Sequence, residues 1–290
     1  MKVAFIGLGN MGAPMAANLA AAGHAVAGFD VSGVVPTGVT AAPTAAQAIV
    51  GAEVIVTMLP NGEILLNTYG LLLPDIPSGT ILLDCSTVAV SDALRAAKMA
   101  VDAGCDALDA PVSGGTSGAA AATLTFMVGG DARAVAQVDP LLRGMGQRVV
   151  HCGGNGAGQA AKLCNNMLLG ISMIGVCEAF VLAHALGLDW HKFYDVASTS
   201  SGACWSMTTY CPAPGIGPAT PADRDYQPGF AAELMLKDLL LARQAALALG
   251  VASPLGEKAT QLYDALVDQG GRGKDFSAML PYLLQIARGV

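Results

Sequence analysis

The chain has 290 residues, of which 53% are hydrophobic and 13% charged, and its formal net charge is −7. This composition is that of a globular protein rather than a disordered one, and the length allows two domains. An acidic chain without a basic stripe argues against nucleic acid as a partner. An anionic substrate would therefore have to be bound by a few local donors.

The seven cysteines are scattered along the chain, and none forms a Cys-x-x-Cys pair. This pattern fits reduced thiols in a cytoplasmic enzyme better than a disulfide framework or a zinc site, so we expect no metal. No signal or transit peptide is recognisable before the first predicted strand. The apolar stretch 163–177 is short and includes two asparagines, so we expect a buried helix rather than a membrane span.

Short apolar runs alternate with alanine-rich helical segments over the first half of the chain. This alternation predicts βαβ units and a doubly wound parallel sheet. Predicted strands are Lys2–Ile6, Ala25–Phe29, Val54–Met58, Thr80–Leu83 and Ala107–Asp109, with 124–128 and 148–151 as extensions of the sheet. Predicted helices are Gly12–Ala22 and Ser91–Ala103.

Strand-like runs disappear after about residue 156, and long helical patterns follow at 157–186, 190–199, 231–249, 254–268 and 275–287. The five prolines between residues 211 and 229 predict an irregular surface loop. The expected fold is therefore an α/β Rossmann-type domain with a doubly wound sheet (1–160), followed by an all-α substrate and oligomerisation domain (161–290). The second domain has more apolar helical surface than it can bury alone, so we expect a homodimer or homotetramer, with no membrane partner.

A glycine-rich turn, Gly7-Leu-Gly-Asn-Met-Gly12, follows the first predicted strand and opens the first helix. This is the context that a dinucleotide-binding G-x-G-x-x-G motif requires. Its glycines allow a tight turn, close approach of backbone to a pyrophosphate, and close packing of helix on strand. On the motif alone, a glycine turn in a protein that binds no nucleotide remains an alternative.

Asp30 ends the second predicted strand, 18 residues after Gly12, where a carboxylate can accept hydrogen bonds from ribose hydroxyls. No arginine follows at 31 or 32 to bind a 2′-phosphate, so NAD is favoured over NADP. An ordinary strand-end aspartate is the alternative. Met58-Leu-Pro60 and Ser86-Thr87 also follow strands, at the edge that binds ligands in open α/β sheets.

The run Ser113-Gly-Gly115 offers a hydroxyl and consecutive N–H groups after another predicted strand, which would suit a carboxylate. A plain glycine turn explains the same spacing equally well. Lys162 and Asn166 lie four residues apart on an otherwise apolar predicted helix and so share one face. Partial burial would lower the pKa of Lys162 and suit it to proton transfer. A lysine that snorkels at the helix edge is the alternative.

Lys237 follows Glu233 by four residues, and the spacing alone favours a surface ion pair over a functional role. The four histidines have neither metal-ligand spacing nor partners at triad-like intervals, so we assign them no catalytic role.

Taken in order, these motifs resemble the β-hydroxyacid dehydrogenase family. The segments that carry the resemblance span nearly the whole chain: 5–12, 109–115, 124–130, 158–166, Ser201-Gly202, Cys204-Trp-Ser206 and Lys237-Asp238. The stretch around Cys204 and the proline-rich segment after Tyr210 are similar to the branch that oxidises 3-hydroxyisobutyrate.

The resemblance implies that Lys162 is catalytic with Asn166 as its helper, that Ser113 and the two glycines bind the substrate carboxylate, and that Lys237 closes over substrate and nicotinamide. The full set of expected contacts is Ser113, Gly114, Gly115 and Lys237 for the substrate, and Gly7, Leu8, Gly9, Asn10, Met11, Gly12, Asp30, Met58, Leu59, Pro60, Thr87 and Lys237 for NAD. Thr116 stands where the family usually has a further small residue, which could tighten the pocket. Ile64 and Ala203 also depart from the family pattern, and we assign them no role.

The activity implied is NAD-dependent oxidation of (S)-3-hydroxyisobutyrate to methylmalonate semialdehyde, a step of valine breakdown, with Lys162 as general acid and base. Relatives that reduce tartronate semialdehyde, succinic semialdehyde or glyoxylate are alternatives that the sequence does not separate. A non-catalytic nucleotide-binding module is a further alternative, although it would be expected to have lost the lysine.

Overall fold

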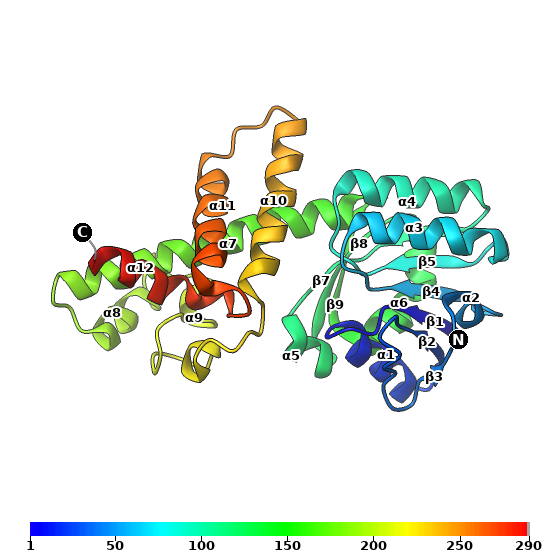
Figure 1. Ribbon diagram of the computed structural model, residues 1–290, viewed down its shortest axis with the longest axis horizontal. Coiled ribbons are helices and arrows are strands. Elements are labelled where there is room, and N and C mark those ends of the chain that lie inside the picture. Colours follow the sequence, from blue (N-terminus) through cyan, green and yellow to red (C-terminus); the bar gives the residue numbers. More distant parts are fainter. Residues whose placement is uncertain (289–290) are drawn as a thin grey trace. The chain divides into compact units, whose positions relative to one another are not determined.

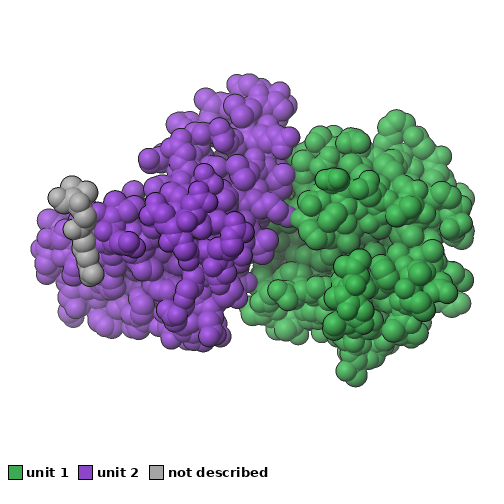
Figure 2. Space-filling model, in the orientation of Figure 1, with its two compact units in different colours: residues 1–162 green, residues 163–290 purple. Residues whose placement is uncertain are grey.

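The computed structural model describes residues 1–288 and divides the chain into two compact units (Figures 1 and 2). Unit 1 comprises residues 1–162, and unit 2 begins at Leu163. The division falls inside a single helix, α7 (Ala157–Ala185), two residues beyond the boundary expected at 160. Each unit has its own hydrophobic core.

Unit 1 is built on a nine-stranded sheet in the order β3-β2-β1-β4-β5-β6-β8-β7, with β9 paired to β8. The strands are β1 (Lys2–Ile6), β2 (Ala25–Phe29), β3 (Thr40–Ala41), β4 (Val54–Thr57), β5 (Ile81–Asp84), β6 (Asp106–Asp109), β7 (Val112–Ser113), β8 (Leu124–Gly129) and β9 (Gly146–Gly153). Pairing is parallel from β3 to β6 and between β8 and β9, whereas β8 runs antiparallel to β6 and β7. The order of the first six strands confirms the expected Rossmann-type sheet.

Successive residues of each strand point to opposite faces of the sheet, and a core lies on each face. Val3 and Phe5 of β1 belong to a cluster shared with α1 (Gly12–Ala21) and α6 (Ala132–Met145). Ala4 and Ile6 belong to a cluster shared with α3 (Gly62–Leu72) and α4 (Val90–Asp102). Because both faces are covered, the inner strands β1, β4 and β5 are almost continuously apolar rather than alternating. The remaining helices of unit 1 are α2 (Ala45–Ala48), the 3-10 turn η1 (Leu73–Asp75) and α5 (Gly115–Ala120).

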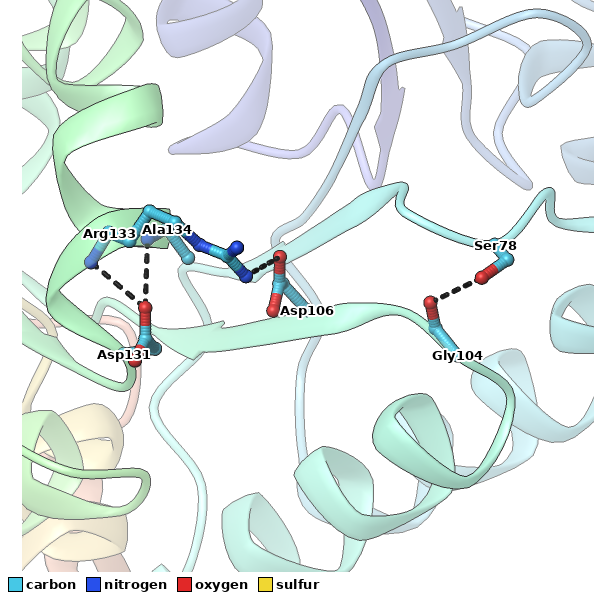
Figure 3. Close-up of polar contacts among 6 residues, drawn as sticks. All are labelled: Ser78, Gly104, Asp106, Asp131, Arg133 and Ala134. Atoms are coloured by element: carbon cyan, nitrogen blue, oxygen red, sulfur yellow. Dashed lines mark hydrogen bonds and ion pairs between the residues drawn. The ribbon is translucent and has the colours of Figure 1, made fainter.

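Helix α6 illustrates how side chains fix an element that hydrophobic pattern alone did not predict (Figure 3). The Asp131 carboxylate accepts hydrogen bonds from the backbone N–H groups of Arg133 (2.9 Å) and Ala134 (3.3 Å), which caps the helix. The Arg133 guanidinium then lies 3.7 Å from the Asp106 carboxylate at the start of β6. In the same view, the Ser78 hydroxyl donates to the Gly104 carbonyl at 2.9 Å and joins the turns before β5 and β6.

Unit 2 is helical, as expected, and the one β feature among its described residues is an isolated bridge between Ala231 and Asp275. After α7 come α8 (Trp190–Ala197), α9 (Trp205–Thr208), η2 (Pro221–Arg224), α10 (Ala232–Ala248), α11 (Pro254–Leu266), the π-helical turn η3 (Val267–Gly271), η4 (Phe276–Ala278) and α12 (Met279–Arg288). Its core joins the middle of α7 to α10, α11 and η4 through Phe180, Met235, Tyr263 and Phe276.

The proline-rich segment 211–229 corrects one expectation. Its backbone is irregular, but it is not simply a surface loop, because Cys211 and Ile216 are buried in the core of unit 2. The Thr220 hydroxyl donates to the Cys211 carbonyl at 2.9 Å, and Thr220 also caps the short helix that starts at Pro221. Prolines predict where regular structure stops, whereas apolar residues between them still pack inward.

Helix α7 has 29 residues. In length and composition it is the one helix among residues 1–288 that could cross a membrane, although core helices of soluble proteins pass the same test. Within its most apolar window, which has a mean hydropathy of 1.8, 39% of the residues are buried in the chain. The expected helix is therefore present but only partly buried. Its polar residues Gln159, Lys162 and Asn166 are among the buried ones.

Candidate active site

The glycine turn lies between β1 and α1, beside the end of β4. Gly7 has a φ of +96°, and a Cβ there would overlap the Met58 carbonyl oxygen. A Cβ at Gly12 would overlap the Gly7 carbonyl oxygen, and the Phe5 ring lies 3.1 Å from that position. Only glycine fits at either point, so the turn stays narrow where it leads into α1. A helix N-terminus of this kind suits a phosphate.

Asp30 follows β2 and is bound to the same turn. Its carboxylate accepts hydrogen bonds at 2.8 Å from the backbone N–H groups of Leu8 and Ser32. The hydrogen bonds from Ser32 and Leu8 lower the pKa of Asp30 and outweigh its slight burial. An ionised carboxylate therefore stands beside the glycine turn, where it can accept hydrogen bonds from ribose hydroxyls.

The loops after β4 and β5 are joined by Ser86. The Leu59 backbone N–H donates to the Ser86 hydroxyl oxygen at 2.8 Å, and that hydroxyl donates to Asp84 at 2.6 Å. The Thr57 hydroxyl donates to the same carboxylate oxygen at 2.7 Å. The expected cofactor residues 58–60 and Thr87 therefore lie on two loops fixed to one buried carboxylate.

Asp84 is fully buried, and burial raises its pKa to about 6 against the hydrogen bonds from Ser86 and Thr57. Its other oxygen, Oδ2, has no hydrogen-bond partner among the described residues, and Asp84 lines a small cavity of about 10 Å³. Tyr69 and Asp109 also line this cavity, and Asp109 is paired in register with Asp84. Burial raises the pKa of Asp109 as well, although N–H groups of Gln159 and Gly156 oppose the shift.

The candidate carboxylate nest and the candidate base meet within unit 1. Ser113 ends β7, and Gly114 and Gly115 follow with φ values of +135° and +62°, which other residues rarely adopt. Lys162 is only 7% exposed, and its ammonium donates to the Val112 carbonyl oxygen at 2.8 Å. Val112 immediately precedes Ser113, so the lysine nitrogen is held next to the start of the nest.

The remaining predicted site residues lie in unit 2. Asn166 is 2% exposed, and its amide donates to the Asp238 carboxylate at 2.5 Å. This bond joins α7 to α10 within the unit, one residue after Lys237. The Glu233 carboxylate accepts a hydrogen bond from the Gly273 N–H at 3.1 Å.

Four buried residues of this region were missed by sequence reasoning as site residues: Asp84, Asp109, Gln159 and Asp238. Asp109 accepts from the N–H groups of Gly156 (2.6 Å) and Gln159 (2.9 Å), so it binds the first turn of α7. The signal available in the sequence was a polar residue at the end of an apolar run. Asp109 ends a predicted strand, and Asp84 directly follows one. Among residues 1–288, no group of three or more His, Cys, Asp or Glu side chains could hold a metal ion.

Comparison with known proteins agrees with this architecture. A family model described as the NAD binding domain of 6-phosphogluconate dehydrogenase matches residues 2–154. A second, described as the NAD-binding of NADP-dependent 3-hydroxyisobutyrate dehydrogenase, matches residues 156–283. The two matches therefore divide the chain close to the start of α7.

Full-length relatives are also found. A probable 3-hydroxyisobutyrate dehydrogenase of Mycobacterium tuberculosis is 47% identical, with 96% of each chain covered. An NAD-dependent L-serine dehydrogenase of Pseudomonas aeruginosa is 46% identical over the same shares. A solved structure of the M. tuberculosis 3-hydroxyisobutyrate dehydrogenase with L-serine superposes with a TM-score of 0.93 at 45% identity, covering 97% of this chain and 98% of that one.

The fold, the glycine turn and these matches together define an NAD-dependent oxidoreductase acting on β-hydroxy acids. Identity of this extent, over nearly the whole of both chains, settles the family. The chain belongs to the 3-hydroxyisobutyrate dehydrogenase family.

Proposed function

We propose that this protein oxidises (S)-3-hydroxyisobutyrate to methylmalonate semialdehyde with NAD⁺, and that Lys162 is its general base. The observation that carries the proposal is the buried Lys162 ammonium, bound to the Val112 carbonyl at the entrance of the Ser113-Gly-Gly115 turn. A lysine in this position stands next to the group that would bind the substrate carboxylate. The β-hydroxyl of a small hydroxy acid bound there would then lie within reach of the amine.

The residues of the glycine turn fit a dinucleotide. Backbone at Gly7 and Gly12 leaves no room for a side chain, and the Asp30 carboxylate is fixed to the Leu8 N–H beside it. We assign the pyrophosphate to the N-terminus of α1 and the adenosine ribose to Asp30. When bound, NAD⁺ supplies the acceptor for the hydride that leaves the carbinol carbon.

Lys162 would act in its neutral form, accepting the hydroxyl proton on oxidation and returning it on reduction. Ser113 and the following N–H groups would hold the substrate carboxylate, so that one end of the substrate is fixed. Asn166, one helical turn after Lys162, would orient the substrate oxygen or the lysine, and its bond to Asp238 fixes its amide. Lys237, next to Asp238 on α10, would bind substrate and nicotinamide.

L-Serine is a second candidate substrate, because the relative at 46% identity is an NAD-dependent L-serine dehydrogenase. Serine and 3-hydroxyisobutyrate share a carboxylate and a β-hydroxyl and differ at C2, which bears an ammonium in one and a methyl in the other. The Lys162 chemistry is the same for both. The preference between these two substrates would therefore depend on the protein group that contacts the C2 substituent.

The test is the initial rate of NADH formation with 3-hydroxyisobutyrate, L-serine, 3-hydroxypropionate and glycerate, in the wild type and in Lys162→Ala. We expect the highest kcat/KM with 3-hydroxyisobutyrate and a fall in kcat of at least about 10²-fold in the variant, as is typical for one acid–base group. NADH binding should survive in that variant. Near-normal turnover by Lys162→Ala would refute the mechanism, whereas a preference for L-serine would refute only the substrate.

We also propose a homodimer or homotetramer built through unit 2. Large apolar side chains remain exposed there, among them Leu182, Leu186, Leu247 and Leu249, each at least 60% exposed. Exposed apolar surface of this kind is typical of an interface. Light scattering on the purified protein would test the proposal, and a monomeric mass would contradict it.

A further inference from the structure

The first turn of α7 is tied to the loop after β5 by one side chain, Gln159. This residue is fully buried. Its amide nitrogen donates to the Ser86 carbonyl oxygen at 2.7 Å, and its amide oxygen accepts from the Val88 N–H at 3.2 Å. Its backbone N–H donates to Asp109 at 2.9 Å. Both ends of the amide are thus used, on residues 71 and 73 positions away in the chain.

The two bonds of this amide flank Thr87, a residue expected to contact the cofactor. Lys162 follows Gln159 by three residues, on the next turn of the same helix. A buried amide is costly unless both its donor and its acceptor are satisfied, and removing this one would take a partner from the Ser86 carbonyl and from the Val88 N–H. The amide therefore contributes a specific geometry more than packing.

The hydrogen bonds of Gln159 are connected, through Ser86, to the loop after β4 as well. The Ser86 hydroxyl accepts from the Leu59 N–H and donates to Asp84. Gln159, Ser86 and Leu59 therefore form a continuous hydrogen-bonded path from α7 to the loops after β5 and β4. All of these residues belong to unit 1.

We propose that Gln159 is a positioning residue, which fixes the position of Lys162 relative to the loops after β4 and β5 that are expected to contact the cofactor. This inference rests on the proposed function, because it takes Lys162 as the base. It assigns Gln159 no contact with the substrate. Its effect should appear in the chemical step, since a misplacement of about 1 Å can cost up to about 10²-fold in rate.

The sharpest variants are Gln159→Leu and Gln159→Glu. Leucine removes both hydrogen bonds at similar volume. A glutamate at this position can donate to the Ser86 carbonyl and accept from Val88 only while it is protonated. When ionised, it places a negative charge against the Ser86 carbonyl and loses the donor. The carboxyls that face this site are Asp109, bound to the Gln159 backbone, and Asp84, bound through Ser86.

The expected result has three parts. Gln159→Leu should lower kcat at least about tenfold, while the NADH dissociation constant measured by fluorescence changes much less. The ratio of the kcat of Gln159→Glu to that of the wild type should rise toward one as the pH falls. The same ratio for Gln159→Leu should not change with pH. Amide hydrogen exchange at Val88 should be faster in Gln159→Leu. Gln137→Glu, at an exposed position of α6, is the matched control and should behave as wild type.

Two outcomes would overturn the inference. One is a Gln159→Leu enzyme with kcat within about twofold of wild type, which lies below the tenfold expected for a displaced base. The other is a parallel pH dependence of the leucine and glutamate variants, because a purely structural defect would not respond to the protonation of residue 159. Lys162→Ala measured beside them separates the two proposals: normal turnover there refutes the proposed function itself, whereas normal turnover confined to Gln159→Leu refutes only this inference.

Discussion

Replacing Asp84 with asparagine should make the protein less sensitive to rising pH. In the folded chain, burial raises the pKa of Asp84 to about 6, from an ordinary value of 3.8. The folded state therefore holds this proton more tightly than the unfolded state does. The stability that results is fully present below pH 3.8 and is lost as the pH rises through about 6.

The magnitude follows from the shift. A difference of about two pKa units corresponds to about 3 kcal/mol in total, of which roughly 1 kcal/mol is lost between about pH 5 and pH 8. Asparagine keeps the oxygen that accepts from Thr57 and Ser86, and it places an uncharged NH₂ where the unpartnered Oδ2 stands. Relative to wild type, the variant should therefore gain about 1 kcal/mol of stability over that pH range.

Urea denaturation at both pH values, followed by far-UV circular dichroism, provides the measurement. Circular dichroism is preferable to fluorescence because both tryptophans, Trp190 and Trp205, lie in unit 2. Asp75→Asn, at an exposed carboxylate of unit 1, is the matched control. If the stability difference between Asp84→Asn and wild type is the same at both pH values, the raised pKa of Asp84 is refuted.

Three further predictions concern the nucleotide-binding half. Gly12→Ala should weaken NADH binding at least about tenfold in a fluorescence titration, because its Cβ would overlap the Gly7 carbonyl; unchanged affinity would mean that the turn can widen freely. Asp30→Ala should reduce the preference for NAD⁺ over NADP⁺ by about tenfold in kcat/KM, as expected for loss of a charged hydrogen-bond acceptor, and an unchanged ratio would show that specificity lies elsewhere. Asp131→Ala removes the cap of α6 and should cost about 1 kcal/mol in urea denaturation. A loss there below about 0.3 kcal/mol would contradict that role of the cap.

The sheet and the long helices could be predicted because their signals are local. Apolar runs bounded by glycine give β1, β2 and β4, and the glycine motif fixes the first βαβ unit. Helix α6 was missed, since it includes Pro140 and Gly144, which usually argue against a helix interior. Its start is nevertheless encoded in the Asp131 cap.

The candidate site residues likewise fall into those that local motifs predict and those that they do not. Residues of the glycine turn, Ser113 and Lys162 belong to motifs that can be read from a few neighbouring positions. Gln159 and Asp238 cannot be found so, because their partners lie 73 and 72 residues away, and no local spacing encodes such a bond. Buried polar contacts between distant segments become visible only when the strands have been placed side by side.

Helix α7 has a consequence for any attempt to study the halves separately. The last four carbonyl groups of a helix have no intrahelical partner, so the final turn frays. A fragment cut at the division between the units, after Lys162, would make residues 159–162 that final turn. Gln159 and Lys162 would then both lie on the least ordered part of the fragment. An isolated nucleotide-binding half would need to extend at least one or two turns further before its lysine reports on the intact protein.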